Sequence, residues 1–130
     1  MILTPAWSFL QVAQGKTLSN KLVRAGRAMN AGVYFVTQNS DDLLDERLKN
    51  NIGLKFAFRS TDIHEIKKTL EFFGLDKEDE SNQKCMRDLE NGQCLMQDLY
   101  GRVGVVQVHP VFEELFHAFD TRPPVQERME

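Results

Sequence analysis

Apolar residues recur every three or four positions in several parts of the chain, a spacing that predicts amphipathic helices. A segment from about Thr17 to Met29 keeps its leucines and valine near one side and its lysines and arginines elsewhere. The clearest helix lies between Asp62 and Gly74, because Asp62 and Glu65 have the spacing of a capping box and a glycine follows the last apolar position. Shorter helices are predicted after an N-cap at Ser40 or Asp41, just before Gly92, and from Phe112 to Phe119.

The apolar side chains of two shorter helices are expected to point inward. In the helix after residue 41 they are Leu43, Leu44 and Leu48. We interpret the stripe of the final helix as a docking face for the sheet rather than a cofactor-binding surface, since its spacing is i, i+3, i+4 and i+7. Its members are Phe112, Leu115, Phe116 and Phe119.

Continuous apolar runs predict the strands. Val33 to Thr37 lacks alternation, which is typical of a strand covered on both faces in a parallel sheet. Leu54 to Phe58 is a second strand, and Met1 to Leu3 can be the end of another. Gln93 to Leu99 and Arg102 to Val108 are separated by two residues and predict an antiparallel hairpin. The fold class is therefore α/β, with mainly parallel central strands, flanking helices and a C-terminal antiparallel hairpin.

Length and charge limit the classes of protein. A chain of 130 residues and 15.0 kDa fits one domain. Its 16 basic and 19 acidic residues are interspersed, so bulk charge does not draw it to nucleic acid or an anionic membrane, and any DNA contact has to be local. The longest apolar runs are far shorter than the ~20 residues of a membrane helix. We expect no transmembrane segment and a cytoplasmic location.

The cysteines and histidines predict no metal site. Cys85 and Cys94 are interpreted as reduced core residues, although the sequence alone leaves a bridge between them open. The three histidines are scattered and give no spacing typical of zinc.

Two polar pairs carry candidate chemistry. Arg24 and Arg27 lie one helical turn apart, so both guanidinium groups can meet one anion, with phosphate the obvious candidate. Thr37 and Gln38 end a predicted strand, where ligands sit in open α/β sheets. Ordinary explanations stay open for both pairs: cations stabilise a helix C-terminus, and a glutamine can begin a solvated loop.

Other candidates have simpler interpretations. The basic residues at strand ends, Lys55, Arg59 and Arg102, could face a nucleotide or a partner, but we expect them to be solvated. Trp7 could be an interface aromatic, but we expect a core anchor.

Four segments share a pattern with a known group of proteins. They are AWSFL at Ala6–Leu10, RAGRAMNAGVYFVTQN at Arg24–Asn39, NNIGLKFAFR at Asn50–Arg59 and NGQCLMQDLYGRVGVVQV at Asn91–Val108. In order and spacing they resemble the C-terminal half of the ATPase domain in conjugation and type IV secretion ATPases. These belong to the HerA and FtsK branch of RecA-like motors, and the likeness is closest for Gram-positive conjugative elements. The resemblance implies a partial RecA-like P-loop NTPase fold, with residues 1–130 as a single domain that lacks the Walker A half.

The resemblance also implies a function for an intact parent. Such a motor binds ATP and Mg²⁺, assembles as a ring expected to be a hexamer, and works with other secretion proteins at the inner face of the cell membrane. It drives transfer of DNA or protein. Gln38 would sense the γ-phosphate with Thr37 fixing it, and Arg27, or less directly Arg24, would be the arginine finger that reaches a neighbour's nucleotide.

The chain departs from the family pattern in two places. It has no GxxxxGK[ST] motif, and Gln14 to Thr17 shares only the end of one. Thr4 and Pro5 stand where the family has an acidic pair, the Walker B carboxylates, so either the chain is a degenerate remnant or its first residues are foreign to the motif. We expect the isolated chain to bind no cofactor and to be inactive. The alternative is a non-catalytic α/β interaction module, as a degenerate paralogue or as a half that completes a partner's site.

Overall fold

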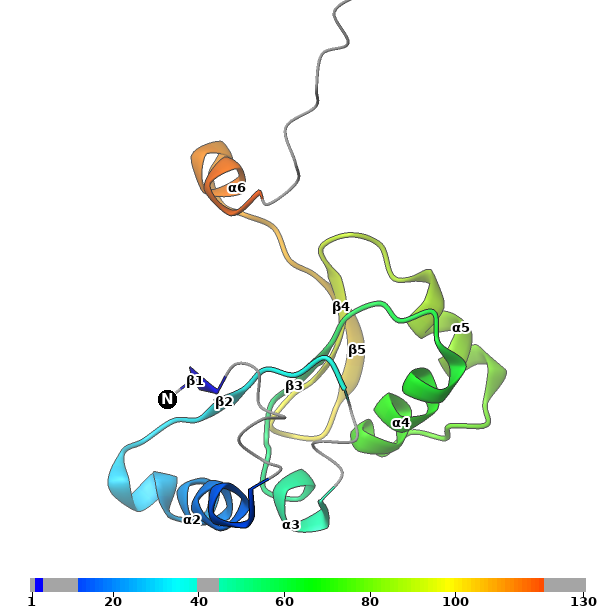
Figure 1. Cartoon of the computed structure of the whole chain (residues 1–130). Coiled ribbons are helices and arrows are strands. Elements are labelled where there is room, and N and C mark those ends of the chain that lie inside the picture. Colours follow the sequence, from blue (N-terminus) through cyan, green and yellow to red (C-terminus); the bar gives the residue numbers. More distant parts are fainter. Residues whose placement is uncertain (1, 4–11, 40–44, 121–130) are drawn as a thin grey trace, which may run out of the picture.

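The computed structural model describes residues 2–3, 12–39 and 45–120, which form two small sheets and five helices (Figure 1). The strands are β1 (Ile2–Leu3), β2 (Tyr34–Phe35), β3 (Lys55–Ala57), β4 (Gln93–Gln97) and β5 (Val103–Gln107). The helices are α2 (Ala13–Met29), α3 (Glu46–Lys49), α4 (Ile63–Phe73), α5 (Glu80–Asp88) and α6 (Glu113–Phe119).

The described strands form two separate sheets. β3, β4 and β5 pair in this order and are antiparallel throughout, whereas β1 and β2 form a separate parallel pair. The α/β class and the C-terminal hairpin are thus confirmed. The prediction of mainly parallel strands is wrong for the described residues. Their larger sheet is antiparallel, because β3 pairs with β4 in the opposite direction and Phe56 lies opposite Met96.

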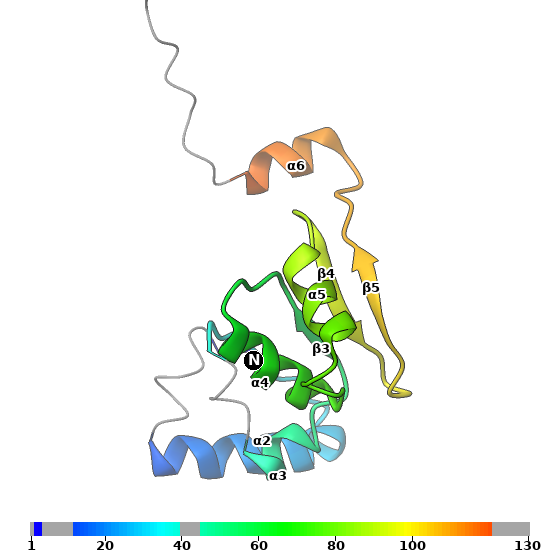
Figure 2. The same ribbon diagram turned by 90° about the vertical axis from the view of Figure 1, so that its right-hand side faces the viewer.

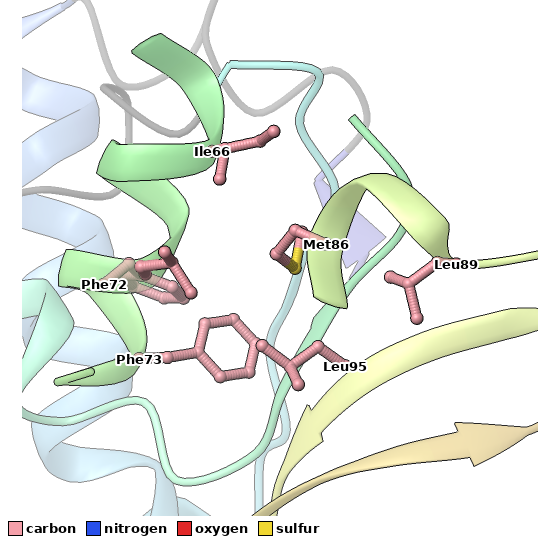
Figure 3. Close-up of a cluster of buried hydrophobic side chains, with 7 residues drawn as sticks. Ile66, Phe72, Phe73, Met86, Leu89 and Leu95 are labelled. Carbon is pink, nitrogen blue, oxygen red and sulfur yellow. The ribbon is translucent and has the colours of Figure 1, made fainter. Parts of the chain in front are cut away.

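The core lies between one face of the larger sheet and the helices α4 and α5, as Figures 1 and 2 show from two directions. Ile66 and Leu70 are fully buried, and Met86 of α5 meets them from the facing helix (Figure 3). The other buried members of this cluster are Phe72, Phe73, Leu89 and Leu95. Every buried member comes from α4, α5, the residue after α5, or β4.

The predicted ends of α4 are confirmed. The Asp62 carboxylate accepts a hydrogen bond of 2.8 Å from the His64 N–H and so caps the N-terminus. At the other end Gly74 adopts a left-handed conformation with φ of 73°, which a residue without Cβ adopts most easily. Helix α5 begins with a similar cap, since the Asp79 carboxylate accepts a 2.8 Å hydrogen bond from the Ser81 N–H.

Two side chains of the sheet hold the C-terminal end of α4. The Lys55 ammonium donates a 3.1 Å hydrogen bond to the carbonyl of Phe72 and lies 4.8 Å from the centre of its ring. The Gln97 amide donates a 3.1 Å hydrogen bond to the carbonyl of Phe73, and Gln97 is the residue opposite Lys55 in the ladder. Burial, and then the charge of Lys49, lower the pKa of Lys55. The prediction that Lys55 is simply solvated is therefore wrong.

The β4–β5 turn is organised by one carboxylate. Asp98 accepts hydrogen bonds of 2.9 Å from the N–H groups of Tyr100 and Arg102, and one of 2.6 Å from the Arg102 side chain. Gly101 completes the turn with φ of 80°. Partial desolvation acts to raise the pKa of Asp98, but these hydrogen bonds from Arg102 and Tyr100 outweigh it and hold the pKa below its usual value.

Two predictions about covered apolar surfaces are wrong. Side chains along 33–37 alternate in exposure, and Tyr34 is 67% exposed, so β2 is not covered on both faces in the described structure. The stripe of α6 does not pack on the sheet, since Phe112 is 63% and Phe116 is 47% exposed. The chain between β5 and α6 runs away from the sheet, which carries the helix clear of it (Figures 1 and 2).

Smaller differences concern helix boundaries and the thiols. Helix α2 begins at Ala13, four residues before the predicted start, so Thr17 lies inside the helix and its hydroxyl donates a 3.0 Å hydrogen bond to the Ala13 carbonyl. Both cysteines are free: Cys94 is buried, as predicted, and burial raises the pKa of its thiol, whereas Cys85 is only half-buried. Leu48 is buried on α3, while the predicted cap at residues 40–41 and the first two leucines lie outside the described residues.

Candidate functional site

The candidate site lies at the carboxyl end of the parallel pair β1 and β2. Ile2 pairs with Tyr34, and Leu3 pairs with Phe35. Since the two strands run in the same direction, the segments that follow them leave the small sheet at the same edge. The residues after β1, including Thr4, Pro5 and Trp7, lie outside the described residues, so the predictions about them stay predictions.

Thr37 and Gln38 stand just beyond β2 at this edge. The half-buried Thr37 hydroxyl accepts a 3.2 Å hydrogen bond from the Asn39 N–H and lies 3.2 Å from the Asn39 carbonyl. This local turn fixes the backbone on both sides of residue 38. Gln38 is exposed, so its amide can be reached from outside the fold.

The two arginines belong to the C-terminal part of α2, the element before β2. Arg24 is exposed, and Arg27 follows three residues later on the same helix. The position of the Arg27 side chain lies outside what the structure describes. The end of α2 leads into the start of β2, whereas Gln38 follows the other end of that strand (Figure 1). The arginines and the Thr37–Gln38 pair thus sit on successive elements, at opposite ends of β2 in chain order.

The turn from α2 into β2 depends on a close backbone contact that the sequence did not predict. Asn30 ends the helix in a left-handed conformation with φ of 50°, and its N–H donates to the Gly26 carbonyl. The Ala31 N–H also donates to that carbonyl, at 2.9 Å. A Cβ added to Gly26 would lie 2.7 Å from the Ala31 carbonyl oxygen. A glycine one turn before an asparagine at a helix end is the signal that could have revealed this contact.

We expect Gly26→Ala to destabilise this part of the chain. The strain of forcing two backbone groups apart costs about 1–3 kcal/mol, which exceeds the gain in helix propensity of about 1 kcal/mol. Urea unfolding followed by far-UV circular dichroism should therefore show the helical signal lost at lower urea. Gly32→Ala is the matched control, since nothing lies within 4 Å of a Cβ there. Equal midpoints for the two variants would contradict the contact.

Residues 2–3, 12–39 and 45–120 contain no group of three histidine, cysteine, aspartate or glutamate side chains that could hold a metal ion. In the same part of the chain, no helix combines the length and apolar character that crossing a bilayer requires.

Comparison of the sequence with known proteins identifies its family. The family model described as an AAA-like domain matches residues 1–119. The chain is also 34% identical over 116 residues to the Bacillus subtilis (strain 168) protein named "Uncharacterized protein YddE". That alignment covers 89% of this chain and 14% of the relative, so the chain spans about a seventh of the curated relative's length. Because the family model covers nearly the whole sequence, the chain belongs to the AAA-like domain family.

Proposed function

We propose that residues 1–130 are a single domain portion from the C-terminal half of a RecA-like motor ATPase, of the HerA and FtsK branch, that powers conjugative transfer. Membership of the AAA-like domain family supports an ATPase-type parent. The match to about a seventh of a longer relative supports a portion of a larger protein, whose remaining strands would complete a mainly parallel sheet. The resemblance of the four sequence segments supports the link to type IV secretion.

The observation that carries this proposal is the parallel pairing of β1 and β2. In the family pattern the acidic pair follows the first of these strands, and the sensor glutamine follows the second. The register that pairs Leu3 with Phe35 brings the two strand ends to one edge, as a shared nucleotide site requires. The exposure of Gln38 is consistent with a role at that edge.

The candidate residues would have different roles at this nucleotide site. The Gln38 amide would hydrogen-bond the γ-phosphate or the attacking water, and Thr37 would hold the backbone that presents it. Arg27 would reach the nucleotide of a neighbouring copy, with Arg24 as the second candidate. A guanidinium suits this task because it stays charged and offers paired donors to phosphoryl oxygens.

The parent would use ATP and Mg²⁺. Residues 37 and 38 fit the γ-phosphate side of such a site, since they offer a hydroxyl and an amide at a strand end. Bound Mg²⁺ would neutralise charge that develops on the phosphates. The parent would act as a homo-oligomeric ring, expected to be a hexamer, at the cytoplasmic side of the membrane. There it would meet other secretion proteins and pass on DNA or protein.

Calorimetric titration of the isolated chain with Mg²⁺ and ATP tests the claim that half of the site is missing. We expect no measurable affinity, because the sequence has no glycine-rich loop and lysine to hold the phosphates. Binding with a micromolar dissociation constant would contradict the proposal. Such binding would equally contradict the alternative of a non-catalytic interaction module.

Thr4 and Pro5 favour a second candidate, a non-catalytic α/β interaction module. Neither side chain can supply the magnesium-linked carboxylate. The reading frame upstream of Met1 discriminates between the two functions. A P-loop followed by an acidic pair before Ala6 would support the motor, whereas a stop codon and a ribosome-binding site directly before Met1 would support the module.

A further inference from the structure

Helix α6 presents an apolar stripe to solvent. Phe112, Leu115 and Phe116 are 63%, 38% and 47% exposed. At 3.6 residues per turn, Glu113 and Glu114 lie on either side of this stripe. These two glutamates give the stripe an acidic rim, and the His117 ring nitrogen lies 3.8 Å from the Glu113 carboxylate. Short helices with i, i+3 and i+4 anchors of this kind commonly bind in apolar grooves.

One flank of α2 has the complementary character. Two adjoining hollows of about 350 and 480 Å³ lie along it, and Leu18 and Lys21 line both. Leu22 and Ala25 extend the apolar stripe of Leu18 at helical spacing, and Arg24 lines the larger hollow. The segment 13–29 contains four basic residues and no acidic one. This flank is therefore an apolar surface with a basic rim.

We propose that α6 of one copy docks on this flank of α2 in a second copy. The apolar anchors of α6 would fill the hollow lined by Leu18 and Leu22, and the glutamates would face Lys21 and Arg24. Opposite rim charges of this kind steer association and fix its register. The mostly apolar lining of the larger hollow favours a helix over the phosphate backbone of DNA, which would need only the cations.

The two surfaces lie at opposite ends of the chain. Figures 1 and 2 both show α6 beyond one end of the larger sheet and α2 beyond the other. A contact between them in different copies is thus head-to-tail, and such a contact generates a ring when its rotation closes. This contact surface rests on the proposed function of the parent as an oligomeric motor, but its formation needs neither nucleotide nor catalysis.

Sedimentation velocity on charge-reversed chains tests the contact. We expect the wild-type chain to self-associate with concentration, and Lys21→Glu with Arg24→Glu to weaken that association about tenfold. Glu113→Lys with Glu114→Lys should do the same. An equimolar mixture of the two double variants should restore association, because each acidic α2 then meets a basic α6. Lys84→Glu on α5, away from both surfaces, is the control and should have no effect.

Disulfide trapping gives a second measurement that does not depend on charge. In a Cys85→Ser background, a Leu18→Cys copy mixed with a Leu115→Cys copy should form a cross-linked heterodimer, whereas Lys84→Cys in place of Leu18→Cys should not.

A wild-type chain that stays monomeric up to millimolar concentration would overturn the inference. So would cross-linking confined to one chain that carries both cysteines, or DNA binding by a monomer that the α2 reversal abolishes. Because no ATP enters these measurements, their failure leaves the sensor and finger roles untouched.

Discussion

Arg27→Ala in the full-length parent is expected to lower the rate of ATP turnover about a thousandfold, since arginine fingers contribute roughly 10³ or more to this chemistry. The guanidinium would neutralise charge that develops on the transferred phosphoryl group of a neighbouring copy. ATP binding should be spared, because the phosphate-binding loop and Mg²⁺ hold the ground state within each copy. Steady-state hydrolysis and a nucleotide-binding titration on the same preparation measure the two effects separately.

Subunit mixing shows whether the arginine acts between copies. A variant that lacks the P-loop lysine cannot hold nucleotide but still offers Arg27 to its neighbour. Mixed with the Arg27→Ala variant, it should restore some turnover, because intact sites form at the contacts between them. Arg24→Ala is the matched comparison, one helical turn away, and should have the smaller effect. Unchanged turnover in Arg27→Ala would reject the finger assignment.

Leu70→Ala should cause a large loss of stability. Leu70 has no exposed surface and belongs to the cluster of side chains from α4, α5 and β4. Truncation of such a leucine removes buried apolar surface and leaves a cavity, which together cost about 2–5 kcal/mol. Domains of this size have a free energy of unfolding of about 5–15 kcal/mol, so the variant should lose a large part of its stability. The urea midpoint by far-UV circular dichroism measures the change.

Leu99→Ala provides the matched control for this truncation. Leu99 is 71% exposed near the tip of the β4–β5 hairpin, so the same atoms are removed from a largely solvated position. We expect a loss below about 1 kcal/mol, as for most surface substitutions. Similar losses for the two variants would contradict the position of the core.

The elements with local signals were predictable from the sequence. Helix α4 has an N-cap at Asp62, a glycine at its end and apolar positions at helical spacing, and the structure confirms all three features. The hairpin of β4 and β5 was predicted from two runs around Gly101. In both cases neighbouring residues carry the information, so no knowledge of distant contacts was needed.

The predictions that proved wrong depend on contacts between residues that are far apart in the sequence. A run such as Val33 to Thr37 is equally apolar whether one or two layers cover it, and the described fold covers β2 on alternate side chains only. The stripe of α6 predicted a helix correctly but not where it packs. Lys55 was misjudged because the Phe72 carbonyl that it binds lies 17 residues away in sequence.

The candidate site was predictable only where neighbouring residues in the sequence define it. The position of Gln38 follows from its place after a strand, and the structure describes it as exposed at that edge. The pairing of β2 with β1 joins segments more than thirty residues apart, and the close contact of Gly26 with Ala31 depends on backbone geometry. Neither is visible as a periodicity. The role of Arg27 rests on the resemblance and stays a prediction.

The core cluster between α4, α5 and β4 has a consequence for how the chain opens. All its buried members come from the half that includes the larger sheet, and Lys55 and Gln97 tie the end of α4 to that sheet. This half should therefore behave as one cooperative unit. Among the side chains whose burial the structure describes, those of α2 and β2 contribute no member to that cluster, so we expect these two elements to fluctuate at lower energy. The half that bears Arg24 and Gln38 would then be the compliant one, and a ligand or neighbour that binds there would use part of its affinity to order it.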